Sequence, residues 1–170
     1  SAQEDFWKGE FGDDYTLRNN GVDFGVSCKN FWGEALGYTK DINSILELGC
    51  NRGLNLNTIR SLKKDIKINA VEINKSAALI ASQESFNIYI GNITENIPEE
   101  FKSDLTFTCG VLIHIAPEFL DKVYRNLFNL SNKYILISEY FSTIPQEILY
   151  RGNPSRMWKR DFAHELWELY

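Results

Sequence analysis

Residues 44–54, Ser-Ile-Leu-Glu-Leu-Gly-Cys-Asn-Arg-Gly-Leu, are the stretch from which the fold can be predicted. The nearly continuous apolar run from Ile45 to Leu48 is typical of a strand that is buried on both faces of a parallel sheet. Gly49 and Gly53 then permit a sharp turn and a close approach of a ligand to the backbone. A helix that follows such a turn points its N-terminal amide groups back at the ligand, which suits a polar or anionic group.

A second apolar segment, residues 67–73, carries a carboxylate at an informative distance from this turn. Glu72 follows Gly53 at roughly the 20-residue spacing at which doubly wound nucleotide-binding folds place the acid that binds a ribose. A solvated carboxylate at a strand end is the alternative. The turn contains no G-x-G and the chain has no Tyr followed four residues later by Lys, so a nicotinamide oxidoreductase is disfavoured.

Five apolar segments predict five strands, which alternate with helical segments of about ten to fifteen residues. This order predicts an α/β fold with a mostly parallel, doubly wound sheet and helices on both of its faces. Ligands bind such a sheet at the carboxyl ends of its strands, where every predicted strand here ends in polar or glycine residues. The predicted strands are residues 44–48, 67–73, 87–93, 103–110 and 133–140.

Composition limits the function further. The 170 residues are 44% hydrophobic, which is enough for one domain with its own core. The net charge of −5 is not that of a nucleic-acid-binding protein. Three widely spaced cysteines without C-x-x-C predict neither a disulfide framework nor a zinc site, and they favour a cytoplasmic location. We expect no membrane span, because no apolar run reaches about 18 residues. No carboxylate/His cluster in the sequence argues for a metal site, although isolated ligands could still converge in the fold.

The two ends of the chain flank the core predicted over residues 44–140. Residues 1–37 combine an aromatic-rich arm and a helix, and the arm is either a lid over a pocket or an extension packed on the core. Residues 141–170 are expected to form a basic loop and a final amphipathic helix, capped by residues 153–155.

The basic residues near that helix suggest an anion site. On a helix, Arg156, Lys159 and Arg160 would share one face near its N-terminus, close to Arg151. Cations at that end oppose the helix dipole, so local stability does not explain them. They are predicted to bind a sugar carboxylate or a nucleotide-sugar phosphate. Pairing with surface carboxylates such as Asp161 or Glu165 is the alternative.

The turn resembles the first motif of class I S-adenosylmethionine-dependent methyltransferases, an acidic residue followed by G-x-G-x-G, with Asn51 in place of the middle glycine. Residues 44–140 resemble the core of that Rossmann-like fold strand by strand. The resemblance implies that the turn holds the methionine part of S-adenosyl-L-methionine, that Glu72 binds the ribose, and that Asn92, where Asp is more usual, contacts the adenine. The implied cofactor-binding residues are Glu47, Gly49, Cys50, Asn51, Gly53, Glu72, Ile73, Asn92, Ile93, Cys109, Gly110 and Val111.

A finer resemblance concerns the substrate. Residues 111–115 match a V-L-x-H-I pattern of small-molecule methyltransferases. Residues 6–19 and 147–163 are similar to a methylase family associated with pseudaminic acid biosynthesis. This implies methylation of a hydroxyl or amine on an anionic sugar or nucleotide-sugar in bacterial surface or flagellar glycan biosynthesis. The D/N-P-P-Y/F stretch of amino-methylating nucleic-acid enzymes is absent from the sequence.

His114 is the candidate general base, because an unperturbed imidazole has a pKa near neutrality. Glu139 and Tyr140, at the end of the fifth strand, are the second choice. Alternatively, His114 caps the following helix or orients the cofactor pocket. A methyltransferase-like module without activity, serving as a partner subunit, is the competing function.

The methyltransferase fold normally closes with an antiparallel pair of strands after the last helix, and no such strands are predicted here. We therefore expect the sequence to be part of a longer chain. Without such strands the edge of the fifth strand would be exposed and prone to association, which suggests homodimerisation through that edge.

Overall fold

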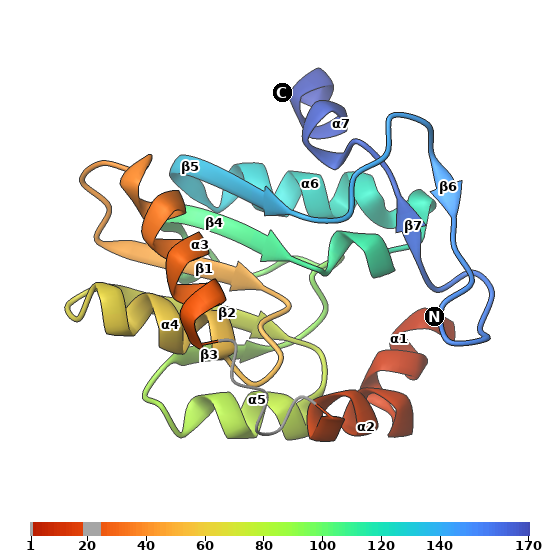
Figure 1. Ribbon diagram of the computed structural model, residues 1–170, viewed down its shortest axis with the longest axis horizontal. Coiled ribbons are helices and arrows are strands. Elements are labelled where there is room, and N and C mark those ends of the chain that lie inside the picture. The colour runs from red at the N-terminus through yellow and green to blue at the C-terminus, as the bar shows by residue number, and fades with distance from the viewer. Residues whose placement is uncertain (1, 19–24) are drawn as a thin grey trace.

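The computed structural model describes residues 2–18 and 25–170. Its centre is a five-stranded parallel sheet with the strand order β3-β2-β1-β4-β5 (Figure 1). The chain leaves β1 first toward β2 and β3 and later toward β4 and β5, so the strand order reverses beside β1. The predicted doubly wound sheet is therefore confirmed. Its strands are β1 (Ser44–Leu48), β2 (Lys67–Glu72), β3 (Asn87–Ile90), β4 (Ser103–Cys109) and β5 (Ser131–Ser138).

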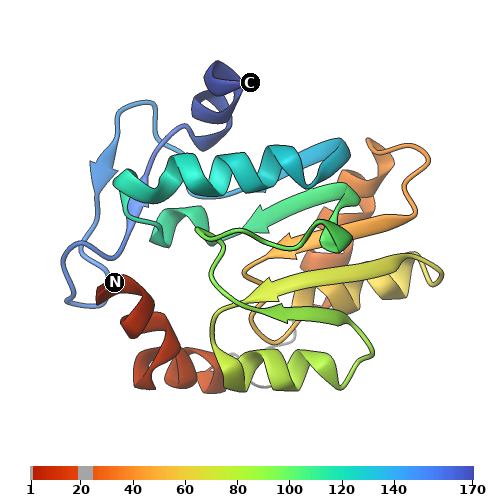
Figure 2. The same cartoon turned by 180° about the vertical axis from the view of Figure 1, so that it is seen from behind.

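Helices cover both faces of this sheet, as Figures 1 and 2 show from opposite sides. On one face, Ile45 packs in a cluster with side chains of α3 (Gly25–Gly37), α4 (Leu54–Leu62) and α5 (Lys75–Ser82). On the other face, Leu46 and Leu48 pack in a cluster with side chains of α6 (Leu120–Asn129). All three β1 side chains are fully buried, which explains why β1 has an apolar run without alternation. Within the described residues, three short 3₁₀ helices occupy connections: η1 (Glu99–Phe101), η2 (Leu112–His114) and η3 (Pro117–Phe119).

The aromatic arm forms two short helices, α1 (Ala2–Lys8) and α2 (Glu10–Arg18), which meet at Gly9. A single long helix is not formed, in agreement with the glycine content of this segment. The arm lies beyond the carboxyl ends of the strands (Figure 1). Residues 19–24, part of the predicted arm and the start of the predicted helix, lie outside the described residues.

The prediction of a helix from residues 153–155 onward is wrong. The segment instead forms two short antiparallel strands, β6 (Gln146–Glu147) and β7 (Trp158–Lys159), and α7 (Phe162–Leu169) begins only after Asp161. The Asp161 carboxylate caps α7 by accepting from the N–H of His164 at 3.1 Å. Trp158 is buried here as part of a strand, so its helix-like spacing from Phe162 was misleading.

This segment also corrects the expectation that no strand pair would be found after β5. The β6–β7 pair is present, but it forms a separate two-stranded sheet and does not extend the edge of β5. Arg156, Lys159 and Arg160 consequently do not share a helical face. None of the helices within residues 2–18 and 25–170 has the length and apolar character of a membrane span.

Candidate functional site

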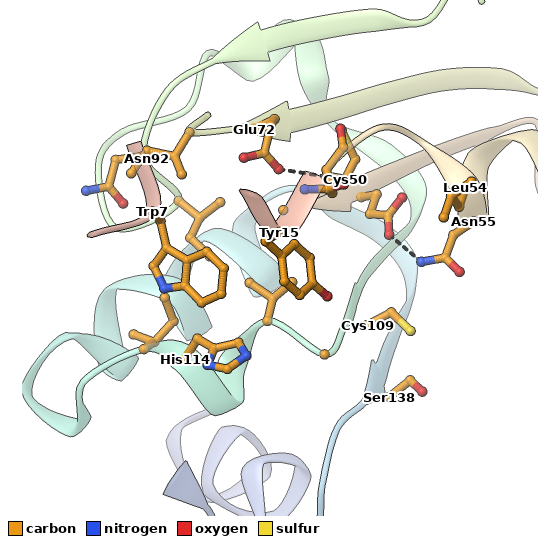
Figure 3. Close-up of a pocket in the computed structure, with 18 of the residues that line it drawn as sticks. Trp7, Tyr15, Cys50, Leu54, Asn55, Glu72, Asn92, Cys109, His114 and Ser138 are labelled. Atoms are coloured by element: carbon orange, nitrogen blue, oxygen red, sulfur yellow. Dashed lines mark hydrogen bonds between the residues drawn. The ribbon is translucent and has the colours of Figure 1, made fainter. Parts of the chain in front are cut away.

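A cavity of about 520 Å³ lies at the carboxyl ends of the strands, beneath the arm (Figure 3). Volumes of this order accommodate small-molecule ligands. The ends of β1, β2, β3 and β4 each contribute predicted cofactor-binding residues to the wall of this cavity. The end of β5 contributes Ser138, which was not predicted. The predicted residues that line the cavity are Glu47, Gly49, Cys50, Asn51, Glu72, Ile73, Asn92, Ile93, Cys109, Gly110 and Val111.

The turn after β1 needs left-handed backbone conformations, which its residues tolerate. Gly49, Asn51 and Gly53 have φ angles of 83°, 48° and 79°. A Cβ atom on Gly49 would lie 2.7 Å from a methyl carbon of Val111, so this position also requires close contact with the β4 loop. Gly53 does not line the cavity; it packs beside Phe86 and is the N-cap residue just before α4. Its predicted contact with the cofactor is therefore replaced by a role in shaping the turn.

The Glu72 carboxylate is buried and held by two backbone amides. One oxygen accepts from the N–H of Asn51 and the other from the N–H of Asn74, both at 2.7 Å. Burial raises the pKa of Glu72, while these hydrogen bonds act in the opposite direction. A carboxylate has about four acceptor positions, so Glu72 can still accept hydrogen bonds from a diol in the cavity.

The Glu47 carboxyl group in the cavity wall is buried and only partly hydrogen-bonded. One of its oxygens accepts from the Asn55 amide at 2.7 Å, and the other is buried without a hydrogen-bond partner among the described residues. Burial raises the pKa of Glu47 to about 8, with a smaller contribution from the negative charge of Glu72, while the Asn55 bond lowers it. A buried carboxyl oxygen without a hydrogen-bond partner is costly unless a ligand supplies one. The ammonium of an amino acid would be such a partner for the ionised carboxylate.

His114 lines the cavity, and its surroundings define its protonation state. Its Nδ1 lies 2.8 Å from the carbonyl oxygen of Arg156. A carbonyl can only accept, so we assign the proton to Nδ1 and a lone pair to Nε2. The ring lies between Trp7 and Tyr150, with centroids 4.7 and 4.8 Å away. Burial lowers the pKa of His114, opposed by the Arg156 hydrogen bond, so the neutral imidazole is favoured at neutral pH.

This assignment predicts a distinctive NMR titration. The resonances of His114 are expected to titrate below pH 6.5, because burial lowers its pKa, and its ¹⁵N shifts are expected to show the Nδ1–H tautomer. The chain has only two histidines, and the other, His164, is exposed on α7, so a His164→Gln variant assigns both signals. An Nε2–H tautomer in the spectrum would contradict the assignment.

The two second-choice bases do not line the cavity. The Glu139 carboxylate accepts from the backbone N–H groups of Val111, Leu112 and Ile113, at 2.9, 3.1 and 3.4 Å. It therefore holds the loop that carries His114. Tyr140 is 60% exposed, and the Lys159 ammonium lies 5.6 Å from its ring centroid. Neither residue is placed to take a proton from a ligand in this cavity.

The predicted cation cluster does not form, and none of its members lines the cavity. Arg160 pairs with Glu165 at 2.7 Å, which is the alternative stated for it above. Arg151 is exposed in a turn, and Lys159 packs against Tyr140. Arg156 places its guanidinium 5.0 Å from the ring centroid of Phe6, toward the arm.

The structure adds residues from the arm to the cavity wall. Gln3, Glu4, Trp7 and Tyr15 line it, and the lid interpretation of this segment is the one that the geometry favours. The aromatic residues were a visible signal in the sequence, but Gln3 and Glu4 had none.

Hydrogen bonds between the arm and the strand-end loops hold it in place. The Gln3 side chain donates to the His114 carbonyl and accepts from the N–H of Ala116, the latter at 3.0 Å. The Asn51 amide donates to the Thr16 hydroxyl at 3.1 Å. Asn51 therefore has a function that the more usual glycine could not perform.

A scan of the sequence against protein-family models and a search of curated protein sequences both gave no match. Solved structures do match. The chain is similar to the PH0226 protein from Pyrococcus horikoshii OT3, with a TM-score of 0.68 and 14% identity over 89% of this chain and 83% of that one.

Two further similar structures are methyltransferases in complex with S-adenosyl-L-homocysteine. The plantazolicin methyltransferase BpumL matches with a TM-score of 0.62 and 18% identity, over 82% of this chain and 58% of its own. The O-methyltransferase from a trans-AT polyketide synthase multienzyme of Brevibacillus brevis matches with a TM-score of 0.61 and 16% identity, over 92% and 54%. The chain thus has the class I methyltransferase fold and spans little more than half the length of these two enzymes.

Proposed function

We propose that this protein is an S-adenosyl-L-methionine-dependent methyltransferase that acts on a small molecule. The observation that carries the proposal is the pair of buried carboxylates, Glu47 and Glu72, on neighbouring strands in the wall of one cavity. Glu72 suits the two hydroxyls of a ribose, and the unpartnered oxygen of Glu47 suits an ammonium. These are two of the groups of S-adenosyl-L-methionine, the ammonium of its amino-acid part and the diol of its ribose.

The cofactor would supply a methyl group on an electrophilic sulfonium. Bound there, it would pass this methyl group to an acceptor oxygen or nitrogen, with the thioether sulfur as the leaving group. The lone pair on His114 Nε2 takes the acceptor's proton, since Nδ1 is already engaged with the Arg156 carbonyl. Alignment of the reactants contributes up to about 7–11 kcal/mol in favourable cases, and a general base adds about 10²–10⁴-fold.

We further propose a sugar or nucleotide-sugar hydroxyl or amine as the acceptor, in bacterial surface or flagellar glycan biosynthesis. This rests on the resemblance of residues 6–19 and 147–163 to the pseudaminic acid-associated methylases. In support, those two segments meet beside the cavity, where the rings of Phe11 and Tyr150 lie 6.0 Å apart and Arg156 packs over Phe6. A cytoplasmic location, an acceptor other than nucleic acid, and a homodimer through the edge of β5 stay predictions.

The test of the cofactor is calorimetric titration of the protein with S-adenosyl-L-homocysteine and, in parallel, with NAD. We expect micromolar binding of the first and none of the second. Glu72→Gln should weaken that binding by about 100-fold, because hydrogen bonds to a charged group each contribute about 1.5–3 kcal/mol. Glu84→Gln, an exposed site in the turn after α5, is the matched control. If the wild-type protein binds neither ligand, the proposal is wrong and a non-catalytic role is favoured.

The test of the acceptor uses release of S-adenosyl-L-homocysteine from S-adenosyl-L-methionine as the signal. Nucleotide-sugars, free sugar acids, phenols and short peptides are compared as acceptors. Turnover only with the sugar compounds would support the finer proposal. Turnover only with phenols or peptides would exclude it and leave the cofactor assignment intact.

A further inference from the structure

We propose that Glu4 of the arm supplies the carboxylate that recognises the amino group of the adenine ring. The inference rests on the proposed function, since it concerns the base of that cofactor. It assigns a binding role to a residue that lies 88 positions from its partner in the sequence, Asn92.

The side chain of Asn92 is committed at both of its polar atoms. Its oxygen accepts from the N–H of Thr94 at 2.9 Å, and its nitrogen donates to a carboxylate oxygen of Glu4 at 2.8 Å. Asn92 is 5% exposed, so these partners fix the orientation of the amide. Residue 92 therefore presents an NH₂ group toward Glu4, and the carboxylate at this corner of the cavity belongs to the arm.

The order of the strands places the base at this corner. Glu47 lies on β1, Glu72 at the end of β2, and Asn92 after β3, and these strands are adjacent in that order. A ligand with its ammonium at Glu47 and its ribose at Glu72 extends its base over the end of β3. Ile73 and Ile93 line the same part of the wall and provide apolar surfaces for a flat ring.

Glu4 is held in position by its neighbour in α1. Gln3 is hydrogen-bonded to the His114 carbonyl and to the N–H of Ala116, which anchors this turn of the helix to the β4 loop. Glu4 itself lines the cavity. The Lys8 ammonium lies 4.0 Å from the Glu4 carboxylate, at the limit of an ion pair. A carboxylate has about four acceptor positions, so Glu4 can hold Asn92 and also accept from a ligand.

This arrangement selects the base by hydrogen-bond polarity. The exocyclic amine of adenine donates two N–H groups, which a carboxylate accepts. A 6-oxo purine presents an oxygen at the same position, which a carboxylate repels. The arm thus provides both a cover for the cavity and the group that distinguishes an aminopurine from an oxopurine.

The experiment compares binding of S-adenosylhomocysteine with binding of its deaminated analogue, S-inosylhomocysteine, by calorimetry. The wild-type protein is expected to prefer the adenosyl compound by at least about tenfold, the effect of one hydrogen bond to a charged group. Glu4→Gln should remove most of this preference, because its amide can donate to the 6-oxo group. Glu10→Gln, an exposed site in the arm, is the matched control and should keep the preference.

A reciprocal exchange makes the test independent of arm stability. Asn92→Asp alone places two carboxylates in contact and should weaken binding of the adenosyl compound. Combining it with Glu4→Gln restores the hydrogen bond with its polarity reversed and moves the carboxylate to residue 92, after β3, so the preference should return.

Two results would overturn the proposal, and they have different meanings. If Glu4→Gln binds and discriminates like the wild type, Glu4 does not read the base, and the proposed function stands. If the wild-type protein fails to bind S-adenosylhomocysteine at all, the proposed function fails and the role of Glu4 fails with it.

Discussion

The affinity for S-adenosyl-L-homocysteine is expected to rise by about 100-fold between about pH 6 and pH 8.5, because only ionised Glu47 pairs with the ligand's ammonium. The pKa of Glu47 is about 8 in the unliganded protein, so the carboxyl is mostly protonated at neutral pH. Below that pKa, the ionised fraction falls tenfold for each pH unit, and the apparent affinity falls with it. Calorimetry across this range measures the slope directly.

Several groups near Glu47 affect this titration. The charge of Glu72 raises the pKa of Glu47, and the Asn55 hydrogen bond lowers it. Burial is the main reason why the pKa values of the Cys50 and Cys109 thiols are raised, and the charge of Glu47 raises them further. Glu72 has a raised pKa of its own, so the variant Glu47→Gln is needed to isolate the Glu47 contribution. We expect this variant to bind weakly with a much flatter pH profile. A wild-type affinity that does not change with pH would refute the role of Glu47.

Replacement of Gly49 by alanine is expected to lower the free energy of unfolding by about 2–5 kcal/mol and to impair cofactor binding. A left-handed conformation costs about 1–2 kcal/mol for a residue with a Cβ, and Gly49 has a φ of 83°. The new Cβ would also lie 2.7 Å from Val111, and such overpacking typically costs about 1–3 kcal/mol. Urea unfolding measures the total.

Gly110 provides a matched control for this prediction. It also has a positive φ, of 67°, but a Cβ there would meet nothing within 4 Å. Gly110→Ala should therefore show only the backbone cost, about 1–2 kcal/mol. Adding Val111→Ala to Gly49→Ala should offset part of the overpacking. Equal losses in Gly49→Ala and Gly110→Ala would show that contact with Val111 is unimportant.

Incorrect predictions arose where several local structures suited the same residues. Residues 153–155 are equally suited to a helix cap and to a turn, and the structure uses them in the turn before β7. Trp158 and Phe162 are spaced as on one face of a helix. Both are buried, but Trp158 lies in β7 and Phe162 is the first residue of α7. Periodicity over so short a segment does not distinguish these cases.

The sequence by itself determined the five strands of the parallel sheet, the glycine turn and the positions of Glu47 and Glu72 at strand ends, whereas the order of the strands came from the tertiary structure. These depend on properties that residues carry locally, namely continuous apolar runs, tolerance of positive φ, and helix capping such as that by Asn74, whose oxygen accepts from the N–H of Ala77 at 2.8 Å. Only the tertiary structure decided that Glu4 reaches Asn92, that Glu139 supports the loop of His114, and that Arg160 pairs with Glu165. The first two contacts join segments that are far apart in the sequence and meet only through the packing of the whole chain. The third depends on the position at which α7 begins, which the local residue pattern did not define.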